Sequence, residues 1–109
     1  MTNQIVVGYD SSPSSLEAVA WAASEARARK ARLMIIACYE IPIGVSAGGA
    51  WLTADVLSSI EDGTAASART VKASVESHDP ELDVQVDVCR GPVRESLIGN
   101  LAPSDLLVV

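Results

Sequence analysis

Residues 5–16 have the sequence IVVGYDSSPSSL, and this stretch decides the fold. A run of β-branched residues ends at Gly8, Tyr9 and Asp10, and serines with one proline follow before a helical pattern begins. This order predicts a buried strand, a tight turn and a helix, with the Asp10 carboxylate at the carboxyl end of the strand. Ligands of open parallel α/β sheets bind beside such strand ends. Asp10 is therefore the first candidate for a functional residue.

The composition fits one α/β domain over residues 1–109. The chain has 109 residues, 49% of them hydrophobic, and it contains no Phe. This length is sufficient to bury a core without disulfides or metals. A core of Val, Ile, Leu and Ala suits helices packed on a parallel sheet. The net charge of −6 argues against nucleic acid or an anionic membrane as the main partner, because both select clustered Lys and Arg.

Signals for export or membrane insertion are absent from the sequence. No signal-peptide pattern opens the chain, and no apolar run approaches the roughly 20 residues that a membrane span needs. Cys38 and Cys89 lie in separate apolar runs and lack the spacing of a metal site. We therefore expect a cytoplasmic protein with buried thiols and no bound metal.

Apolar periodicity divides the chain into alternating strands and helices. Strands are expected at residues 5–10, 33–39, 82–89 and 105–109, and helices near 13–29, near 55–77 and after Gly91 and Pro92. The first helix is expected to bury Leu16, Val19, Ala20, Ala23 and Ala26, and the second Leu57, Ile60, Thr64, Ala68, Val71 and Val75. Residues 33–39 are continuously apolar, as in an interior strand. Residues 82–89 alternate Val with Asp or Gln, which is typical of a sheet edge.

The alternation of strands and helices predicts an open parallel sheet with right-handed crossovers, a Rossmann-like α/β fold. An edge position for residues 82–89 favours the strand order 3-2-1-4. The chain then reverses direction between the first and fourth strands, and Asp10 lies on one wall of that crevice. The sequence stops at Val109, directly after a buried strand, so we expect the chain to be a fragment of a longer protein.

The turn after the first strand supports more than one interpretation. Asp10 could accept hydrogen bonds from vicinal hydroxyls such as those of a ribose, or it could satisfy N–H groups of its own turn. Ser11 and Ser12 lie at a helix start, where N–H groups form a weak anion site. A capping role is favoured for Ser12; alternatively, Ser14 and Glu17 form a capping box.

Residues 5–23, 35–39, 86–92 and 105–109 together resemble universal stress protein domains. The matching sequences are GYDSSPSSLEAVAWA within residues 5–23, VDVCRGP at residues 86–92 and DLLVV at residues 105–109. The resemblance covers nearly the whole chain. It implies a fold like that of the adenine nucleotide alpha hydrolases, with a fifth strand that often forms the dimer edge and is missing from this sequence.

The resemblance also implies a ligand and its site. Many members of the family bind ATP, with Mg²⁺ as an optional companion, in the crevice at the switch point. By this resemblance Asp10 contacts the ribose and adenine side, the backbone of Gly8 and Tyr9 lies beside the adenine, and Cys38 lines the adenine slot. Ser11 adds a hydroxyl at the same turn. The family's glycine-rich phosphate loop follows the fourth strand, so weak or absent ATP binding is expected for residues 1–109 alone.

We therefore expect a stress-response nucleotide sensor or switch that forms a homodimer in its complete form. The alternative is an interaction module of the same family that binds no nucleotide. An enzyme is disfavoured, with at most slow ATP hydrolysis, because the sequence has no recognisable catalytic set. A phospho-acceptor role for Asp10 is disfavoured because no acidic neighbour follows its strand. His78, before Asp79 and Pro80, is expected to be exposed at a helix end.

Overall fold

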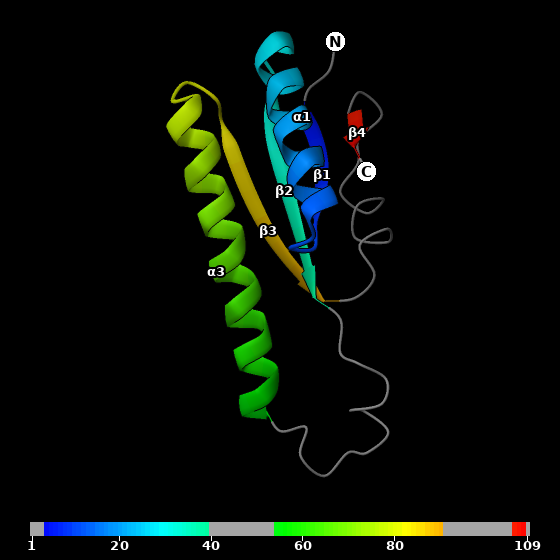
Figure 1. Cartoon of the computed structure of the whole chain (residues 1–109), viewed down its shortest axis with the longest axis vertical. Coiled ribbons are helices and arrows are strands. Elements are labelled where there is room, and N and C mark those ends of the chain that lie inside the picture. The colour runs from blue at the N-terminus through cyan, green and yellow to red at the C-terminus, as the bar shows by residue number, and fades with distance from the viewer. Residues whose placement is uncertain (1–3, 40–53, 91–105, 109) are drawn as a thin grey trace.

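The chain forms an α/β fold with a parallel sheet, which confirms the predicted class (Figure 1). The computed structural model describes residues 4–39, 54–90 and 106–108. Within them lie β1 (Gln4–Tyr9), α1 (Pro13–Arg29), β2 (Arg32–Tyr39), α3 (Ala54–His78), β3 (Val84–Arg90) and β4 (Leu106–Val108). The short helix expected after Gly91 and Pro92 lies outside the described residues.

The four described strands are all parallel and lie in the order β3-β2-β1-β4. Val7 of β1 is aligned with Ile35 of β2 on one side and with Val108 of β4 on the other. The chain therefore leaves β1 toward one edge of the sheet and returns to pair β1 on its opposite side. This arrangement makes the carboxyl end of β1 a point where the direction of the chain reverses.

Side chains of the sheet divide between two apolar clusters because successive residues of a strand point to opposite faces. Figure 1 shows α1 and α3 on the same face of the sheet. The main core on that face includes Ile5, Val7, Leu33, Ile35 and Val84, which are at most 3% exposed. The other cluster consists of Val6, Ile36 and Cys38, with Met34 and Cys89 packed against it.

The first helix has the predicted bounds but buries a different stripe. Its buried residues are Val19, Ala22 and Ala26, whereas Leu16 is 45% exposed and Ala20 is exposed too. An alanine-rich helix offers several small-residue stripes at the same spacing, so periodicity locates the helix without fixing its rotation. Burying Ala22 in place of Leu16 and Ala20 corrects the expectation.

The second described helix, α3, matches its predicted position to within one residue at each end. Ala68 and Val71 are buried against the sheet and Val75 is partly buried. The Asp79 N–H donates to the Val75 carbonyl at 3.0 Å, and the helix ends before Pro80. Neither described helix combines the length and apolar character needed to span a bilayer.

Gly63 offers a direct test of the helical stability of α3. It is exposed, and a Cβ atom there would meet no atom within 4 Å. We expect Gly63→Ala to raise the free energy of unfolding by about 0.8–1 kcal/mol, because Gly loses more backbone freedom in a helix. Urea denaturation followed by circular dichroism measures it. Ala66→Gly at another exposed position of α3 should lower stability by a similar amount, and an unchanged Gly63→Ala variant would contradict the expectation.

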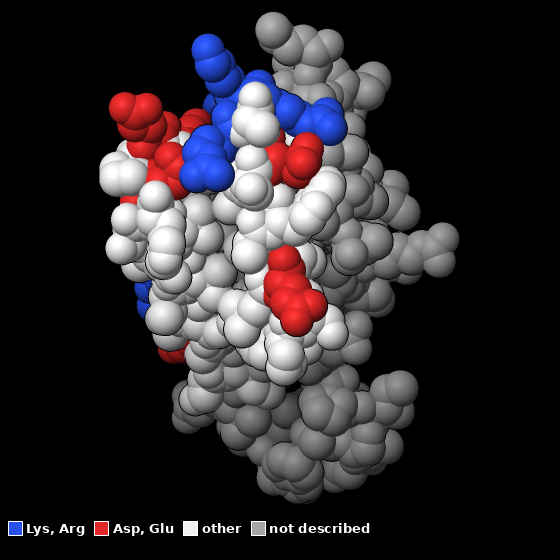
Figure 2. Space-filling model, turned by 45° about the horizontal axis from the view of Figure 1, so that its top comes forward, with Lys and Arg blue, Asp and Glu red and all other residues white. Residues whose placement is uncertain are grey.

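Charged residues gather where α1 ends, with both signs interspersed (Figure 2). Arg29 pairs with Glu25 at 3.0 Å, and Arg32 pairs with Asp83 at 3.1 Å. These are exposed ion pairs, which contribute little to stability because water and salt screen them. The positive charges at this end of α1 are therefore interleaved with carboxylates, which does not favour a polyanion-binding surface.

Candidate functional site

The turn after β1 is built around the Asp10 side chain. The Ser12 N–H donates to Asp10 Oδ1 at 3.0 Å, and the Asp10 N–H donates to Ser15 Oγ at 3.3 Å. The side chain thus bridges the turn and orders the entry to α1. Asp10 remains exposed. An ionised carboxylate has about four acceptor positions, so the turn leaves it able to accept further hydrogen bonds from a ligand.

Hydrogen bonds to the serines lower the pKa of Asp10. The Ser12 hydroxyl has the largest effect, followed by the Ser12 N–H and then the Ser15 hydroxyl, while slight burial acts in the opposite direction. These donors favour the charged carboxylate. Asp10 is therefore an anion at neutral pH, which suits it to accept bonds from hydroxyl groups and makes it repel a phosphate placed beside it.

The lowered pKa of Asp10 predicts a defined pH dependence of stability. Its contribution is present above the unfolded-state pKa of about 3.9 and is lost as the pH falls through the lower folded-state value. Asp10→Asn should lower the Tm at neutral pH and reduce the loss of Tm on acidification below about pH 4. Thermal denaturation from neutral to acidic pH measures both. Asp62→Asn is the control, because Asp62 is exposed on α3, and an Asp10→Asn profile parallel to wild type would refute this role.

Ser12, rather than Ser14, caps α1. Its backbone is extended, with φ −78° and ψ 155°, and its hydroxyl accepts from the Ser15 N–H at 3.1 Å. Pro13 takes the first helical position, where no N–H is required. Of the two capping schemes considered from the sequence, the one with Ser12 is confirmed.

Ser11 adopts a conformation that non-glycine residues seldom take. Its φ of 70° lies in the left-handed region, which costs roughly 1–2 kcal/mol for a residue with a Cβ. Its hydroxyl lies 3.4 Å from Ser67 Oγ of α3. The strained residue therefore directly follows Asp10, and the turn that holds the carboxylate also contacts the second helix.

The Tyr9 side chain packs in the main core and makes a hydrogen bond there. The ring is buried on the helical face of the sheet, and its hydroxyl is 2.8 Å from Ser67 Oγ. Sequence reasoning missed Ser67, although it lies one turn before Val71 on the buried stripe of α3, where a polar residue needs a partner. With the ring engaged in this way, the Tyr9 backbone is what would be offered to a ligand.

The bond between Tyr9 and Ser67 predicts a measurable coupling. Tyr9→Phe should lower the free energy of unfolding by about 1 kcal/mol, because it removes one hydroxyl and leaves the other half-buried. Urea denaturation of Tyr9→Phe, Ser67→Ala and the double variant gives the coupling energy. The double variant should cost less than the sum of the single ones, whereas strict additivity would mean that the hydroxyls act independently.

Gly8 and Cys38 belong to the opposite face of the sheet from the Tyr9 ring. Gly8 lies two residues after Val6, whose side chain packs with Cys38 in the smaller cluster. Tyr9 is aligned with Ala37, so Cys38 is one residue further along the neighbouring strand. The structure thus brings Gly8, Tyr9, Asp10 and Ser11 together in one continuous segment and Cys38 to the same end of β2.

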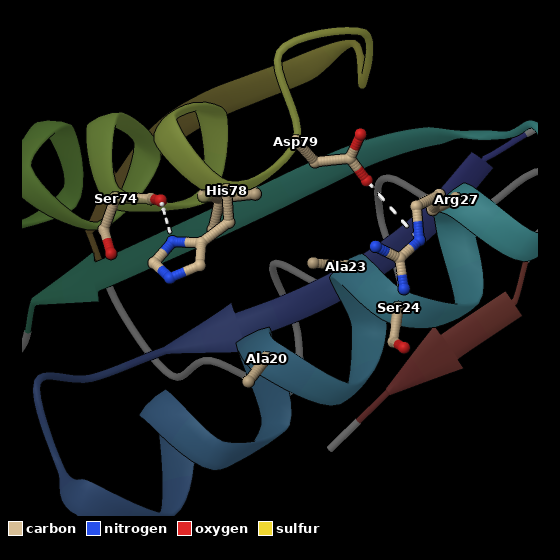
Figure 3. A pocket seen from close by; sticks show the side chains of 8 residues that line it. Ala20, Ala23, Ser24, Arg27, Ser74, His78 and Asp79 are labelled. Carbon is tan, nitrogen blue, oxygen red and sulfur yellow. Dashed lines mark hydrogen bonds and ion pairs between the residues drawn. The ribbon is translucent and has the colours of Figure 1, made fainter.

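Two grooves described by the structure lie toward the other end of the sheet. One, of about 310 Å³, separates α1 from α3 and is shown in Figure 3. There the His78 Nδ1–H donates to the Ser74 carbonyl at 2.9 Å, and Arg27 pairs with Asp79 at 3.7 Å. The second, of about 580 Å³, adjoins the start of β2. Neither contains a predicted site residue, and His78 is exposed as expected.

Metal-binding side chains do not converge in the part of the chain that the structure describes. No group of three or more His, Cys, Asp or Glu residues there has the geometry to hold an ion. Asp10 is accompanied by serines rather than by other carboxylates. The serines around Asp10 therefore suit its carboxylate to accept hydrogen bonds.

A parallel α/β sheet with an exposed carboxylate at its point of reversal defines a domain of the class that holds ligands at strand ends. The chain belongs to the universal stress protein family, whose sequence model matches residues 1–108. A universal stress protein solved in complex with cAMP is 27% identical, with a TM-score of 0.68 over 98% of this chain and 75% of that chain. Another, from Archaeoglobus fulgidus, is 12% identical, with a TM-score of 0.49 over 100% of this chain and 95% of that one. The comparison with curated proteins found no match.

Proposed function

We propose that this chain binds an adenine nucleotide at the carboxyl end of β1, with the ribose hydroxyls donating to Asp10. The observation that carries the proposal is the exposed Asp10 carboxylate directly after β1, the strand flanked by β2 and β4. A charged acceptor at such a position suits a pair of hydroxyl groups, because charge-assisted hydrogen bonds are about twice as strong as neutral ones. Membership of the family and the cAMP complex of a relative support the choice of an adenine nucleotide.

The remaining predicted residues have defined roles in this proposal. The backbone of Gly8 and Tyr9 lies along the adenine, where the missing side chain of Gly8 permits close approach. Cys38 lines the adenine slot from the neighbouring strand. Ser11 supplies a hydroxyl beside the ribose. Its strained backbone conformation supports this role, because such conformations cluster at functional sites.

We further propose that the adenosine part of the ligand supplies most of the affinity in residues 1–109. The physiological ligand is ATP, with Mg²⁺ as an optional companion, and its phosphates are held by a glycine-rich loop after the fourth strand. Asp10 repels a neighbouring phosphate, and the chain carries a net charge of −6. In residues 1–109 we therefore expect ATP to gain little affinity over adenosine.

The wider role is that of a stress-response sensor or switch. The residues 1–109 form one domain with strand order 3-2-1-4, and a fifth strand completes the sheet and provides the edge of a homodimer. The protein acts in the cytoplasm and has no nucleic-acid or membrane partner. Catalysis is at most slow ATP hydrolysis.

Isothermal titration calorimetry of the 109-residue chain tests the ligand class. Adenosine and ATP, which both have two free ribose hydroxyls, should bind with affinities within about tenfold of each other, since one tenfold step is about 1.4 kcal/mol. Guanosine is the control, and a site that takes adenine as proposed should bind it at least tenfold more weakly. Equal binding of guanosine, or heat from none of the nucleosides and nucleotides, would overturn the proposal.

One observation favours the alternative, an interaction module that binds no nucleotide. On α1, Trp21 is 52% exposed and Leu16 is 45% exposed, although both are large apolar side chains. Aromatic residues of this kind often anchor protein interfaces. Mass spectrometry of the protein after denaturation discriminates the two functions: a co-purified adenine nucleotide supports the site at Asp10, whereas a nucleotide-free protein that Trp21→Ala releases from its partner supports the interaction module.

A further inference from the structure

The two cysteines of the chain are neighbours across the sheet. Cys38 of β2 and Cys89 of β3 are aligned with each other in the parallel register. Directly opposite residues of neighbouring strands point to the same face. Both thiols therefore belong to the smaller apolar cluster, where Cys89 packs against the group formed by Val6, Ile36 and Cys38.

The strand spacing brings the cysteines within the range of a disulfide. Neighbouring strands lie about 4.7–4.9 Å apart, and disulfides join Cα atoms that are about 4.4–6.8 Å apart. The Cβ atoms of a disulfide lie closer than the strands, at about 3.5–4.5 Å. A bond between Cys38 and Cys89 thus needs the two Cβ atoms to approach each other by about 1 Å, and it would be strained once formed.

The two thiols differ in accessibility. Cys38 is 8% exposed, whereas Cys89 is half-buried and its thiol donates to Asp87 Oδ2 at 3.7 Å on the same strand face. A reagent from solvent therefore reaches Cys89 first. The structure has both residues as cysteines without a disulfide between them.

We propose that Cys38 and Cys89 form a reversible redox site that a low-molecular-weight disulfide oxidises. The Cys89 thiolate attacks one sulfur of that disulfide, the sulfur–sulfur bond breaks, and a small thiolate leaves. The Cys38 thiolate then attacks Cys89 Sγ and expels the second small thiolate. The protein loses two protons and two electrons and gains one disulfide bond, and the small disulfide is reduced to two thiols.

Strain makes this site a reversible one. A disulfide with compressed geometry has a more oxidising potential than a structural disulfide, so cellular thiols can reduce it again. The bond joins β3 to the interior strand β2 at the end of the sheet where Asp10 lies. The chemistry depends only on the pair of thiols and stands whether or not a nucleotide binds.

The test incubates the reduced 109-residue chain in glutathione buffers with a rising share of oxidised glutathione. Alkylation of the remaining thiols and mass spectrometry follow. Wild type should pass from two alkylated thiols to none and lose the mass of two hydrogen atoms without keeping glutathione. Peptide mapping should join the segments that contain Cys38 and Cys89, and mild reduction should restore both thiols.

Single variants separate the two steps. Cys38→Ala should keep one glutathione on Cys89, because no second thiol is present to displace it. Cys89→Ala should react more slowly than Cys38→Ala, because the remaining Cys38 thiol is 8% exposed and is less accessible to the small disulfide. Wild type that keeps glutathione as Cys38→Ala does, or that forms disulfides only between chains, would overturn the proposal. The wild-type peptide map decides the question even if a variant does not fold.

Discussion

Ile35→Ala is expected to lower the free energy of unfolding by about 3–4 kcal/mol. Ile35 is 0% exposed and lies in β2, between β1 and β3. It is aligned with Val7 on one side and Val86 on the other, and it belongs to the main core beneath the helices. Truncation removes buried methylene and methyl groups and leaves a cavity, and both losses add.

The loss expected for Ile35→Ala is large relative to the total free energy of unfolding of the domain. Domains of this size have free energies of unfolding of about 5–15 kcal/mol, so the Ile35→Ala variant should be partly unfolded in moderate urea where wild type is intact. Urea denaturation followed by circular dichroism measures the midpoint and the slope.

Ile35→Val should cost only about 1 kcal/mol, because it deletes a single methyl group. Trp21→Ala should change stability by at most about 0.5 kcal/mol, because its side chain is half exposed. A cost for Ile35→Ala as small as that of Trp21→Ala would mean that this part of the core is not tightly packed.

The strands could be predicted because the burial of one or both faces of a strand determines its pattern of apolar residues. Residues of β2 from Leu33 to Cys38 are apolar without interruption, and the structure covers both of their faces. In β3 the valines face the helices, whereas Gln85 and Asp87 are exposed on the other face. Helix ends were equally readable, since Ser12 with Pro13 and Asp79 with Pro80 are local signals.

Features that depend on distant contacts could not be predicted in the same way. The rotation of α1 depends on how closely Ala22 approaches the sheet, and its alanines look alike in sequence. The bond from Tyr9 to Ser67 spans 58 positions. The alignment of Cys38 with Cys89 depends on the register of β2 and β3, which no local pattern encodes. The role of Asp10 in its turn was one of two interpretations, and the hydrogen bond from Ser12 establishes that one while leaving the ligand role as a proposal.

Asp10→Ala is expected to weaken adenosine binding by about ten- to a hundredfold. The reason is the loss of at least one charge-assisted hydrogen bond to a ribose hydroxyl, worth about 1.5–3 kcal/mol. Calorimetry with adenosine on the wild type and the variant measures the ratio. The same substitution also removes the acceptor for the Ser12 N–H, so a disordered turn could weaken binding for a different reason.

A change of ligand separates these two causes. If Asp10 binds the ribose directly, 2′-deoxyadenosine should bind more weakly than adenosine to the wild type, and Asp10→Ala should reduce this difference. Asp10→Asn provides the matched variant, because its side-chain oxygen can still accept from Ser12 while the charge is gone. It should keep the turn and lose part of the preference for ribose. If Asp10→Ala weakens both nucleosides by the same factor and Asp10→Asn weakens neither, the carboxylate serves only the turn, since a contact with the hydroxyls must depend on their presence.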